Sequence, residues 1–500
     1  MPMNVAIIGA GSKEFTRKLV GDLLSVPELR DTCFHLTDID EKNLELMDLI
    51  VKNDIKNNNL PAKVFSSKNR KEVLEGADYV INSVRVGGIE AYETDINIPL
   101  KYGVDQCVGD TICAGGIMYG QRNIPVILDI CKDIKEVSSK DVLFLNYSNP
   151  NAMNTWAANK YGEVNTVGLC HGVYGGHKQI TNVIELLING DKKEEDAGFT
   201  PVTMEDVDIV CAGINHQTWY TKVQYKGEDW TGRLLEGFLK HPDYRETEKI
   251  RIDMIKRFGY YSTESNGHLS EYLPWYRKRP NEIKEWIHLG ESWIHGETGG
   301  YLRYTKESRE KFLSDNISSQ EKNVISKENR SHEHASYIIE ALETGRVYRG
   351  HFNVQNNHCI SNLPNDCIVE VPGYVDKNGI NIPRLGDLPI GCAAVCNVSV
   401  NVQRLAVEAA VHGDVNFLKQ AMMMDPLVGA VCNPPEIWQM TNEMLIAQKA
   451  WLPQYFSEIK EIEKSYTWNN NLGRFSTEGA ARLNESEHSK SKMKESLELE

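Results

Sequence analysis

Short apolar runs alternate with amphipathic segments over the first 170 residues of the chain. The β-branched run from Val5 to Ile8 leads into glycines, and apolar residues then recur at helical spacing from Lys13 to Leu24. Because strands alternate with helices here, the pattern predicts an α/β fold with a parallel, doubly wound sheet. Further strands are expected at 33–36, 77–84, 142–146 and 166–169.

The pattern changes after about residue 170. Strand-like runs at 207–210 and 221–225 mix with long charged helical segments. Residues 350–372 are rich in Asn and Cys, and we expect them to be irregular. Residues 481–500 carry few large apolar side chains, so a disordered tail is expected there.

The composition narrows the class of protein. The 500 residues include 55 Lys and Arg against 70 Asp and Glu, a net charge of −15, which argues against binding to a nucleic-acid backbone. No run approaches the roughly 18 apolar residues of a membrane helix, and the first residues do not resemble a signal peptide. The 11 scattered cysteines favour a reducing compartment. We therefore expect a cytoplasmic enzyme without a nucleic-acid or membrane partner.

A glycine-rich turn lies between the first strand and the first helix. Gly9 would permit a tight turn, Gly11 would let the backbone approach a pyrophosphate, and the helix starting after Ser12 would offer free N–H groups. Asp38, after the second strand, could bind the ribose hydroxyls and favours NAD over NADP. Glu14 replaces the third glycine of the usual motif, so a turn without a ligand is the alternative.

Two candidate metal ligands follow predicted strands. Cys170, with His171 beside it, comes after the run 166–169, and His216 comes after the run 207–210. A thiolate and an imidazole leave several coordination positions open, and they suit Mn, Fe, Co, Ni or Zn better than Mg or Ca. The alternative is a buried thiol next to a surface histidine.

Eight motifs follow one another along the chain from the N-terminus to about Phe456. They are Gly9-Ala-Gly-Ser12, Asp38-Ile-Asp40, Gly109-Asp-Thr with Gly115-Gly116, Ser148-Asn-Pro150, Cys170-His-Gly-Val, Gly213-Ile-Asn-His216, Asn362-Leu-Pro364 and Val369-Glu-Val-Pro372. In this order they resemble glycoside hydrolase family 4, the glycosidases that depend on NAD and a divalent metal. The resemblance implies a Rossmann-like NAD-binding domain at 1–170 and a mixed α/β domain at 171–480, assembled as a homodimer or homotetramer.

The resemblance also implies roles for single residues. Cys170 and His216 match the metal ligands, with Mn expected and Ni, Co or Fe as alternatives, and Asn149 matches a residue that holds sugar hydroxyls. His171 is expected to be the acid that assists the leaving group, the alternative being that it only orients the substrate or metal.

The chemistry that the resemblance implies is a redox-assisted elimination. NAD takes hydride from sugar carbon 3, which makes the proton on carbon 2 acidic. A base removes that proton while the metal stabilises the enediolate, and the aglycone leaves from carbon 1. Water then adds and NADH returns the hydride, so that the net reaction on the small sugar substrate is hydrolysis.

The sequence does not single out one residue as the base that removes the proton from sugar carbon 2. The family motif aligns near Ser265, which is not a plausible base. The candidates in this segment are Tyr272, Glu264 and Tyr260, and we choose Tyr272. The Thr-Glu-Ser and Glu-Tyr elements of the same segment resemble the galactosidase-type branch of the family.

The motif at 170–173, Cys-His-Gly-Val, instead resembles the uronidase branch. We therefore expect α-galacturonides or α-glucuronides as substrates, with a neutral α-galactosidase or α-glucosidase as the alternative. A more distant alternative is a plain NAD-dependent hydroxy-acid dehydrogenase. A uronate needs a cationic partner, for which the candidates are Arg85, Arg122 and Lys178, although each is more often a surface charge.

Overall fold

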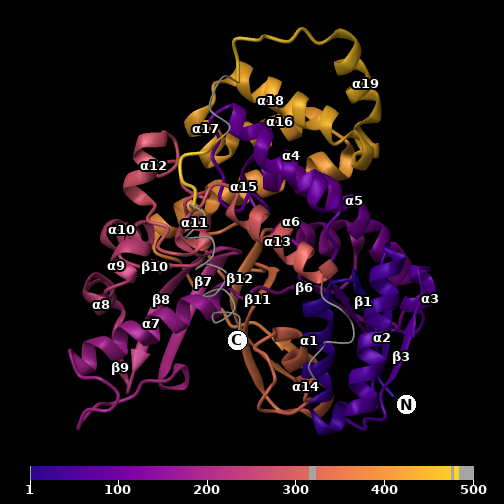
Figure 1. Cartoon of the computed structure of the whole chain (residues 1–500), viewed down its shortest axis with the longest axis vertical. Coiled ribbons are helices and arrows are strands. Elements are labelled where there is room, and N and C mark those ends of the chain that lie inside the picture. The colour runs from indigo at the N-terminus through magenta and orange to yellow at the C-terminus, as the bar shows by residue number, and fades with distance from the viewer. Residues whose placement is uncertain (1, 315–322, 474–477, 484–500) are drawn as a thin grey trace.

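One mixed β-sheet extends across the whole protein (Figure 1). The computed structural model describes residues 2–314, 323–473 and 478–483. The sheet has the order β10-β8-β7-β12-β11-β6-β5-β4-β1-β2-β3, with β13 beside β12 and β9 beside β8. Its strands are β1 Asn4–Ile8, β2 Cys33–Thr37, β3 Lys63–Ser66, β4 Tyr79–Asn82, β5 Leu143–Asn146, β6 Thr166–Gly168, β7 Val207–Ile214, β8 Gln217–Tyr225, β9 Glu228–Asp229, β10 Tyr261–Ser262, β11 Tyr348–Gln355, β12 Ile368–Asp376 and β13 Gly379–Asn381.

The sheet has a parallel and an antiparallel half. Strands β1 to β6 pair in parallel, as the alternation of strands and helices predicts. The other half is antiparallel, and the two halves join where Asn353 of β11 pairs with Gly168 of β6. The fold is therefore α/β with a Rossmann-like parallel part and a mixed part. Because the sheet continues across residue 170, the division into two domains stays a prediction.

Helices lie against the sheet, and a further group of helices lies above it in the view of Figure 1. This group includes α16 and α18, which pack against α4 and α5, and it lies away from α1, α2 and α14. The α-helices are α1 Lys13–Leu24, α2 Glu41–Asn57, α3 Arg70–Leu74, α4 Gly88–Lys101, α5 Cys113–Val137, α6 Asn151–Ala157, α7 Gly172–Asn189, α8 Leu234–Lys240, α9 Tyr244–Thr247, α10 Lys249–Phe258, α11 Asn266–Leu269, α12 Pro280–Trp286, α13 Gly300–Ser314, α14 His334–Thr344, α15 Ile390–His412, α16 Val415–Met424, α17 Pro426–Val431, α18 Pro434–Ala447 and α19 Phe456–Ser465.

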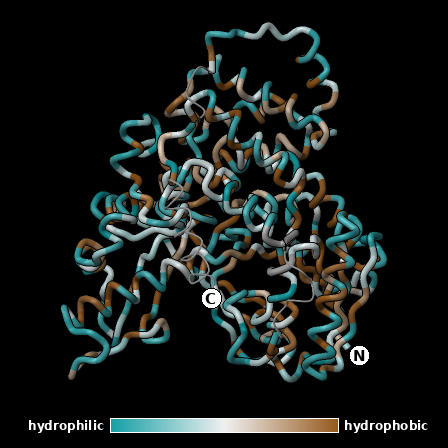
Figure 2. Tube along the Cα trace, viewed as in Figure 1, coloured by the Kyte–Doolittle hydropathy of each residue, from teal (hydrophilic) through white to brown (hydrophobic). Residues whose placement is uncertain are grey.

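Helix α15 is the apolar centre of the mixed half. It packs against α5, α6 and α16, and its cysteines Cys392 and Cys396 are buried in the main core. By length and composition it is the one described helix that could cross a membrane, yet half of the relevant stretch is buried inside the protein. The hydropathy trace shows mixed apolar and polar positions along the outer helices, which is typical of helices that cover a core (Figure 2).

The expectation that residues 350–372 are irregular holds for 356–367, which form a loop, and is wrong for the two ends of the range. β11 covers Tyr348–Gln355 and β12 covers Ile368–Asp376, and the two pair along their full length. Strand β11 lies inside the sheet, where its four consecutive residues 350–353 are all buried. Apolar and polar positions therefore do not alternate along it, and the usual signal of a strand is absent.

The expected tail overlaps the described residues only at 481–483. Ala481 and Leu483 are buried there, and the backbone of Ala481 accepts a hydrogen bond from the Thr298 N–H at 2.7 Å. The rest of the expected tail, 484–500, lies outside the described residues.

Candidate active site

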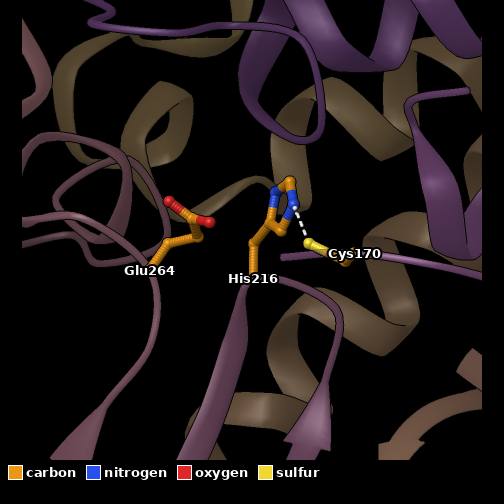
Figure 3. Close-up of side chains that lie close together, drawn as sticks. All are labelled: Cys170, His216 and Glu264. Atoms are coloured by element: carbon orange, nitrogen blue, oxygen red, sulfur yellow. Dashed lines mark hydrogen bonds between the residues drawn. The ribbon is translucent and has the colours of Figure 1, made fainter. Parts of the chain in front are cut away.

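The candidate metal ligands meet beside the sheet. Cys170 lies just beyond the end of β6, and His216 lies in the tight turn between β7 and β8. The sulfur Sγ of Cys170 is 3.0 Å from Nε2 of His216. Glu264, which follows β10, faces the same histidine from the other side (Figure 3). Sequence positions 94 residues apart therefore form one cluster.

The donor set of this cluster fits a divalent metal. One sulfur, one imidazole nitrogen and one carboxylate oxygen from Cys170, His216 and Glu264 lie within 4.8 Å of one another. Burial lowers the pKa of His216 to about 4, and His268 adds to this effect. The neutral imidazole is the form that binds metal. Burial raises the pKa of the Cys170 thiol, as do Glu370 and Glu264, so a bound cation would have to stabilise the thiolate.

A chain of buried hydrogen bonds leads away from His216. Its Nδ1 lies 2.8 Å from Nε2 of His268 and 3.1 Å from the hydroxyl of Thr111. Nδ1 of His268 in turn lies 2.6 Å from a carboxylate oxygen of Glu271. We did not assign His268 or Glu271 from the sequence. The signal was the spacing of three residues between them, which brings a histidine and a carboxylate together at a short helix.

Asn149 lies beside a second buried carboxylate, Asp110. The Asn149 amide donates to Asp110 at 3.1 Å, and Arg85 donates to the same oxygen at 3.2 Å. Burial alone would raise the pKa of Asp110, but Arg85 and the histidines His268 and His216 outweigh burial and lower it. Asp110 is therefore ionised near neutral pH, and Asn149 is held at the edge of the cluster.

His171 is the exposed histidine of the site. Its Nε2 lies 2.6 Å from Oε1 of Glu333, at the start of α14. Burial of the ring nitrogen opposes the charged form, but the hydrogen bond and charge of Glu333 outweigh burial and raise the pKa of His171. A histidine with a raised pKa and an exposed side chain can donate a proton to a ligand.

Of the three candidate bases, Glu264 is part of the cluster. Its pKa is lowered, since the charges of His216 and His268 outweigh the opposing effect of burial. Tyr272 is buried, its hydroxyl donates to the Asn215 carbonyl at 3.3 Å, and burial together with Asp110 and Glu271 raises its pKa. Tyr260 packs against the main apolar core.

A further buried carboxylate, Glu370 of β12, contacts Asn215, the residue before His216. Burial raises the pKa of Glu370 to about 8, against the opposing hydrogen bond from Asn215. The Asn215 amide reaches its Oε2 at 3.3 Å, while Oε1 is buried without a hydrogen-bond partner among the described residues. Glu370 belongs to the motif at 369–372, which the sequence singles out without giving it a role.

The glycine-rich turn has the geometry expected of a nucleotide cradle. Gly9 has a φ of 82°, which favours glycine, and its N–H donates to the Thr37 carbonyl at 3.0 Å. The Gly11 N–H donates to Asp38 at 2.8 Å, and a Cβ on Gly11 would lie at the same distance from that carboxylate. Ser12 is exposed at the start of α1, and its side chain makes no capping hydrogen bond. This turn could hold a dinucleotide phosphate at the helix N-terminus.

Comparison with known families settles the class of protein. A family model described as "Family 4 glycosyl hydrolase" matches residues 4–186, and another described as "Family 4 glycosyl hydrolase C-terminal domain" matches residues 211–428. The chain belongs to glycosyl hydrolase family 4. The resemblance stated from the sequence motifs is thereby confirmed, and the protein is a glycosidase by class.

Relatives with different activities differ in how similar their sequences are to this chain. An α-galactosidase of Rhizobium meliloti (strain 1021) is 57% identical over 458 residues, which cover 91% of this chain and 90% of that protein. An α-galacturonidase of Lachnoclostridium phytofermentans is 27% identical over 477 residues, which cover 90% of this chain and 97% of that protein. These identities support the neutral alternative, an α-galactosidase, better than the expected preference for uronides.

A solved structure shows that the fold is shared. The 6-phospho-alpha-glucosidase from gut microorganisms, in complex with NAD and glucose-6-phosphate, is 26% identical with a TM-score of 0.69. The match covers 90% of this chain and 99% of that one.

Proposed function

We propose that this family 4 glycosidase hydrolyses neutral α-galactosides and uses NAD and a divalent cation, with Mn expected. The charge at the site carries this proposal. The carboxylates Asp110 and Glu264 flank Asn149 and His216 and have lowered pKa values, so they are ionised near neutral pH. They would repel the carboxylate of a uronide, whereas a neutral sugar carries no such charge.

Of the three cationic residues that could bind a uronate, two are held in ion pairs and one is exposed on the surface of α7. Arg85 is paired with Asp110, and its guanidinium lies 4.7 Å from the ring centre of Tyr92 and 4.9 Å from that of Tyr119. Arg122 is buried in an ion pair with Asp95, and Lys178 is exposed on α7. This arrangement supports a neutral sugar, in line with the 57% identical α-galactosidase.

The residues present fit both cofactors. The turn from Gly9 to Ser12 and the carboxylate of Asp38 would hold NAD, which the related phospho-glucosidase binds. Cys170 and His216 would hold the cation. NAD would supply reversible oxidation of the sugar, and the cation would supply positive charge that stabilises a developing anion.

The side chains of the protein would position the sugar and transfer protons to and from it. Asn149 holds sugar hydroxyls, and His171 donates a proton to the leaving oxygen while Glu333 keeps its ring in place. We assign the base for carbon 2 to Glu264 in place of Tyr272. Glu264 is ionised at the cluster, whereas the Tyr272 hydroxyl donates to Asn215 and has a raised pKa. A cytoplasmic location and a dimer or tetramer stay predictions.

The test is turnover of four p-nitrophenyl α-glycosides, namely the galactoside, glucoside, galacturonide and glucuronide. Each is assayed with NAD, Mn²⁺ and a thiol reductant, because oxidation of Cys170 would remove a metal ligand. We expect the highest kcat/KM for the galactoside. A higher value for the galacturonide would overturn the neutral-sugar proposal.

The assignment of the base has its own test. With galactoside deuterated at carbon 2, the enzyme should exchange the label with solvent during turnover. Glu264→Gln should abolish this exchange, whereas Tyr272→Phe should keep it. The opposite pattern would return the role of base to Tyr272.

A further inference from the structure

Residues 479–483, near the end of the chain, dock onto the turn before α13. The N–H of Thr298 donates to the Ala481 carbonyl at 2.7 Å, and the N–H of Ala481 donates back to the Thr298 hydroxyl at 3.3 Å. Arg482 donates to the Thr298 carbonyl. Ala481, Leu483 and Thr298 are all buried. This C-terminal segment is therefore part of the packed protein, although 183 residues separate Ala481 from Thr298 in the chain.

Thr298 also holds the start of the loop between α4 and α5. Its hydroxyl donates to the two carboxylate oxygens of Asp105, at 2.8 and 2.9 Å. The N–H of Ala480, in the C-terminal segment, donates to the same carboxylate at 2.8 Å. Arg277 completes the set with a buried ion pair to Asp105. Asp105 is thus held jointly by Thr298, by Arg277 and by the end of the chain.

This loop, residues 105–111, leads directly into the candidate active site. It contains no helix or strand, so its path depends on hydrogen bonds to other parts of the protein. One of them comes from the residue after Thr298, since the N–H of Gly299 donates to the Gln106 carbonyl at 2.7 Å. Near the far end of the loop, Asp110 accepts the amide of Asn149 at 3.1 Å. The turn at Thr298 and the site are therefore connected through one short loop.

We propose that residues 479–483 are a positioning segment of the active site. Docked on Thr298, they fix the path of the loop 105–111. The loop in turn places Asp110 beside Asn149, and the inference rests on the proposed function in that Asn149 holds the sugar. Release of the segment should therefore weaken sugar binding. The nucleotide turn and the metal ligands lie on other elements, so their affinities should not change.

One glycine allows the segment to dock. Gly479 has a φ of 81°, and a Cβ there would lie 2.4 Å from Cγ2 of Thr298 and 2.7 Å from both Cβ and Oγ1. These atoms belong to a buried, β-branched side chain, which has little freedom to move aside. Gly479→Ala should therefore lift the segment off Thr298. The matched control is Gly227→Ala, before β9, where φ is also 81° but a Cβ would meet nothing within 4 Å.

Steady-state kinetics compares these two variants with wild type. The substrate is whichever of the four p-nitrophenyl α-glycosides wild type hydrolyses best, so the choice of sugar does not decide the result. In Gly479→Ala, KM should rise about fivefold, the effect of one lost hydrogen bond, while kcat changes by a smaller factor. Gly227→Ala should match wild type in both constants, and NAD affinity should be equal in all three proteins. Equal KM values in Gly479→Ala and Gly227→Ala would overturn the role of the segment.

A pair of substitutions at Thr298 tests the same connection from its other side. Valine keeps the shape of threonine but lacks the hydroxyl that bonds Asp105 and the Ala481 N–H, whereas serine keeps that hydroxyl. Thr298→Val should therefore raise KM more than Thr298→Ser does. The reverse order would show that Thr298 fills space and does not transmit the position of the segment.

Hydrogen exchange needs no substrate and separates this inference from the proposed function. Measured by mass spectrometry, amide exchange over residues 105–111 should be about tenfold faster in Gly479→Ala than in wild type and Gly227→Ala. Equal exchange in the three proteins would overturn the inference. A wild type that hydrolyses none of the four glycosides would overturn the proposed function, whereas the exchange rates would still decide whether the segment fixes the loop.

Discussion

Gly172 and Glu264 approach each other so closely that a Cβ on Gly172 would lie 2.9 Å from Oε1 of Glu264. Gly172 is the first residue of α7, directly after His171, and Glu264 follows β10. The missing side chain at position 172 therefore makes room for the carboxylate to face His216. In the sequence, Gly172 is part of the motif at 170–173 that resembles the uronidase branch, whereas the structure connects it to the carboxylate of the cluster.

Gly172→Ala should lower turnover. The added methyl group must displace the end of the Glu264 side chain, and a shift of this size at a catalytic group can reduce kcat by about 100-fold. The matched control is Gly175→Ala, three residues along the same helix, where a Cβ would meet nothing within 4 Å. Steady-state kinetics on the α-galactoside measures the effect. Equal kcat in the two variants would show that Glu264 does not act from its present position.

Cys170→Ser should abolish metal-dependent activity and leave NAD binding intact. A hydroxyl is a harder and much less acidic ligand than a thiol, so binding of Mn²⁺ or Co²⁺ should fall at least tenfold. The control is Cys33→Ser, a half-buried cysteine at the start of β2. Titration with each cation and with NAD separates the two sites. Unchanged affinity for the cation would remove Cys170 from the metal.

The sequence predicted those parts of the protein whose signals are local. The run Val5 to Ile8, the glycines and the helix from Lys13 to Leu24 were each expected, and the structure contains β1 and α1 there. Cys170 and His216 were expected to meet because both follow predicted strands. Their approach to 3.0 Å agrees with that reasoning, although their role as ligands stays a prediction.

Features that depend on long-range packing were missed. Strand β11 has no alternating pattern because its central residues are buried in the middle of the sheet. Glu264 was one of three open candidates, since its place beside His216 depends on the pairing of β10 with β8. Glu271 acts on His268 and on the N–H groups of Val108 and Gly109, more than 160 residues earlier in the chain. Pattern reasoning has no access to such contacts.

Arg122→Met should destabilise the protein strongly. The guanidinium of Arg122 and the carboxylate of Asp95 form a two-pronged pair with distances of 2.9 and 2.6 Å, and both side chains are only 1% exposed. Removal of one partner leaves a buried charge, which costs about 3–5 kcal/mol. Arg309→Met, which breaks an exposed pair with Glu90, should cost about 1 kcal/mol or less.

Denaturant unfolding monitored by circular dichroism measures both free energies. The double variant Arg122→Met with Asp95→Asn should recover part of the lost stability, because no unpaired charge remains. A cost for Arg122→Met no larger than that for Arg309→Met would show that the buried pair contributes little.

Protonation of Glu248 at low pH should make the folded protein less stable. Burial alone would raise its pKa, but Arg251, at 3.1 Å, and His295 outweigh burial and lower the pKa from 4.5 to about 2. Between these values the unfolded chain binds the proton and the folded protein does not. The stability that Glu248 contributes is therefore complete above about pH 4.5 and is lost as the pH falls toward 2, by about 2 kcal/mol at pH 3.

Glu248→Gln cannot titrate, so its free energy of unfolding should fall less between pH 7 and pH 3 than that of wild type, by the same 2 kcal/mol or so. The control is Glu228→Gln in the exposed strand β9, which should follow the wild-type curve. Urea unfolding at a series of pH values provides the comparison. Parallel curves for wild type and Glu248→Gln would mean that Arg251 and His295 do not hold this carboxylate in its charged form.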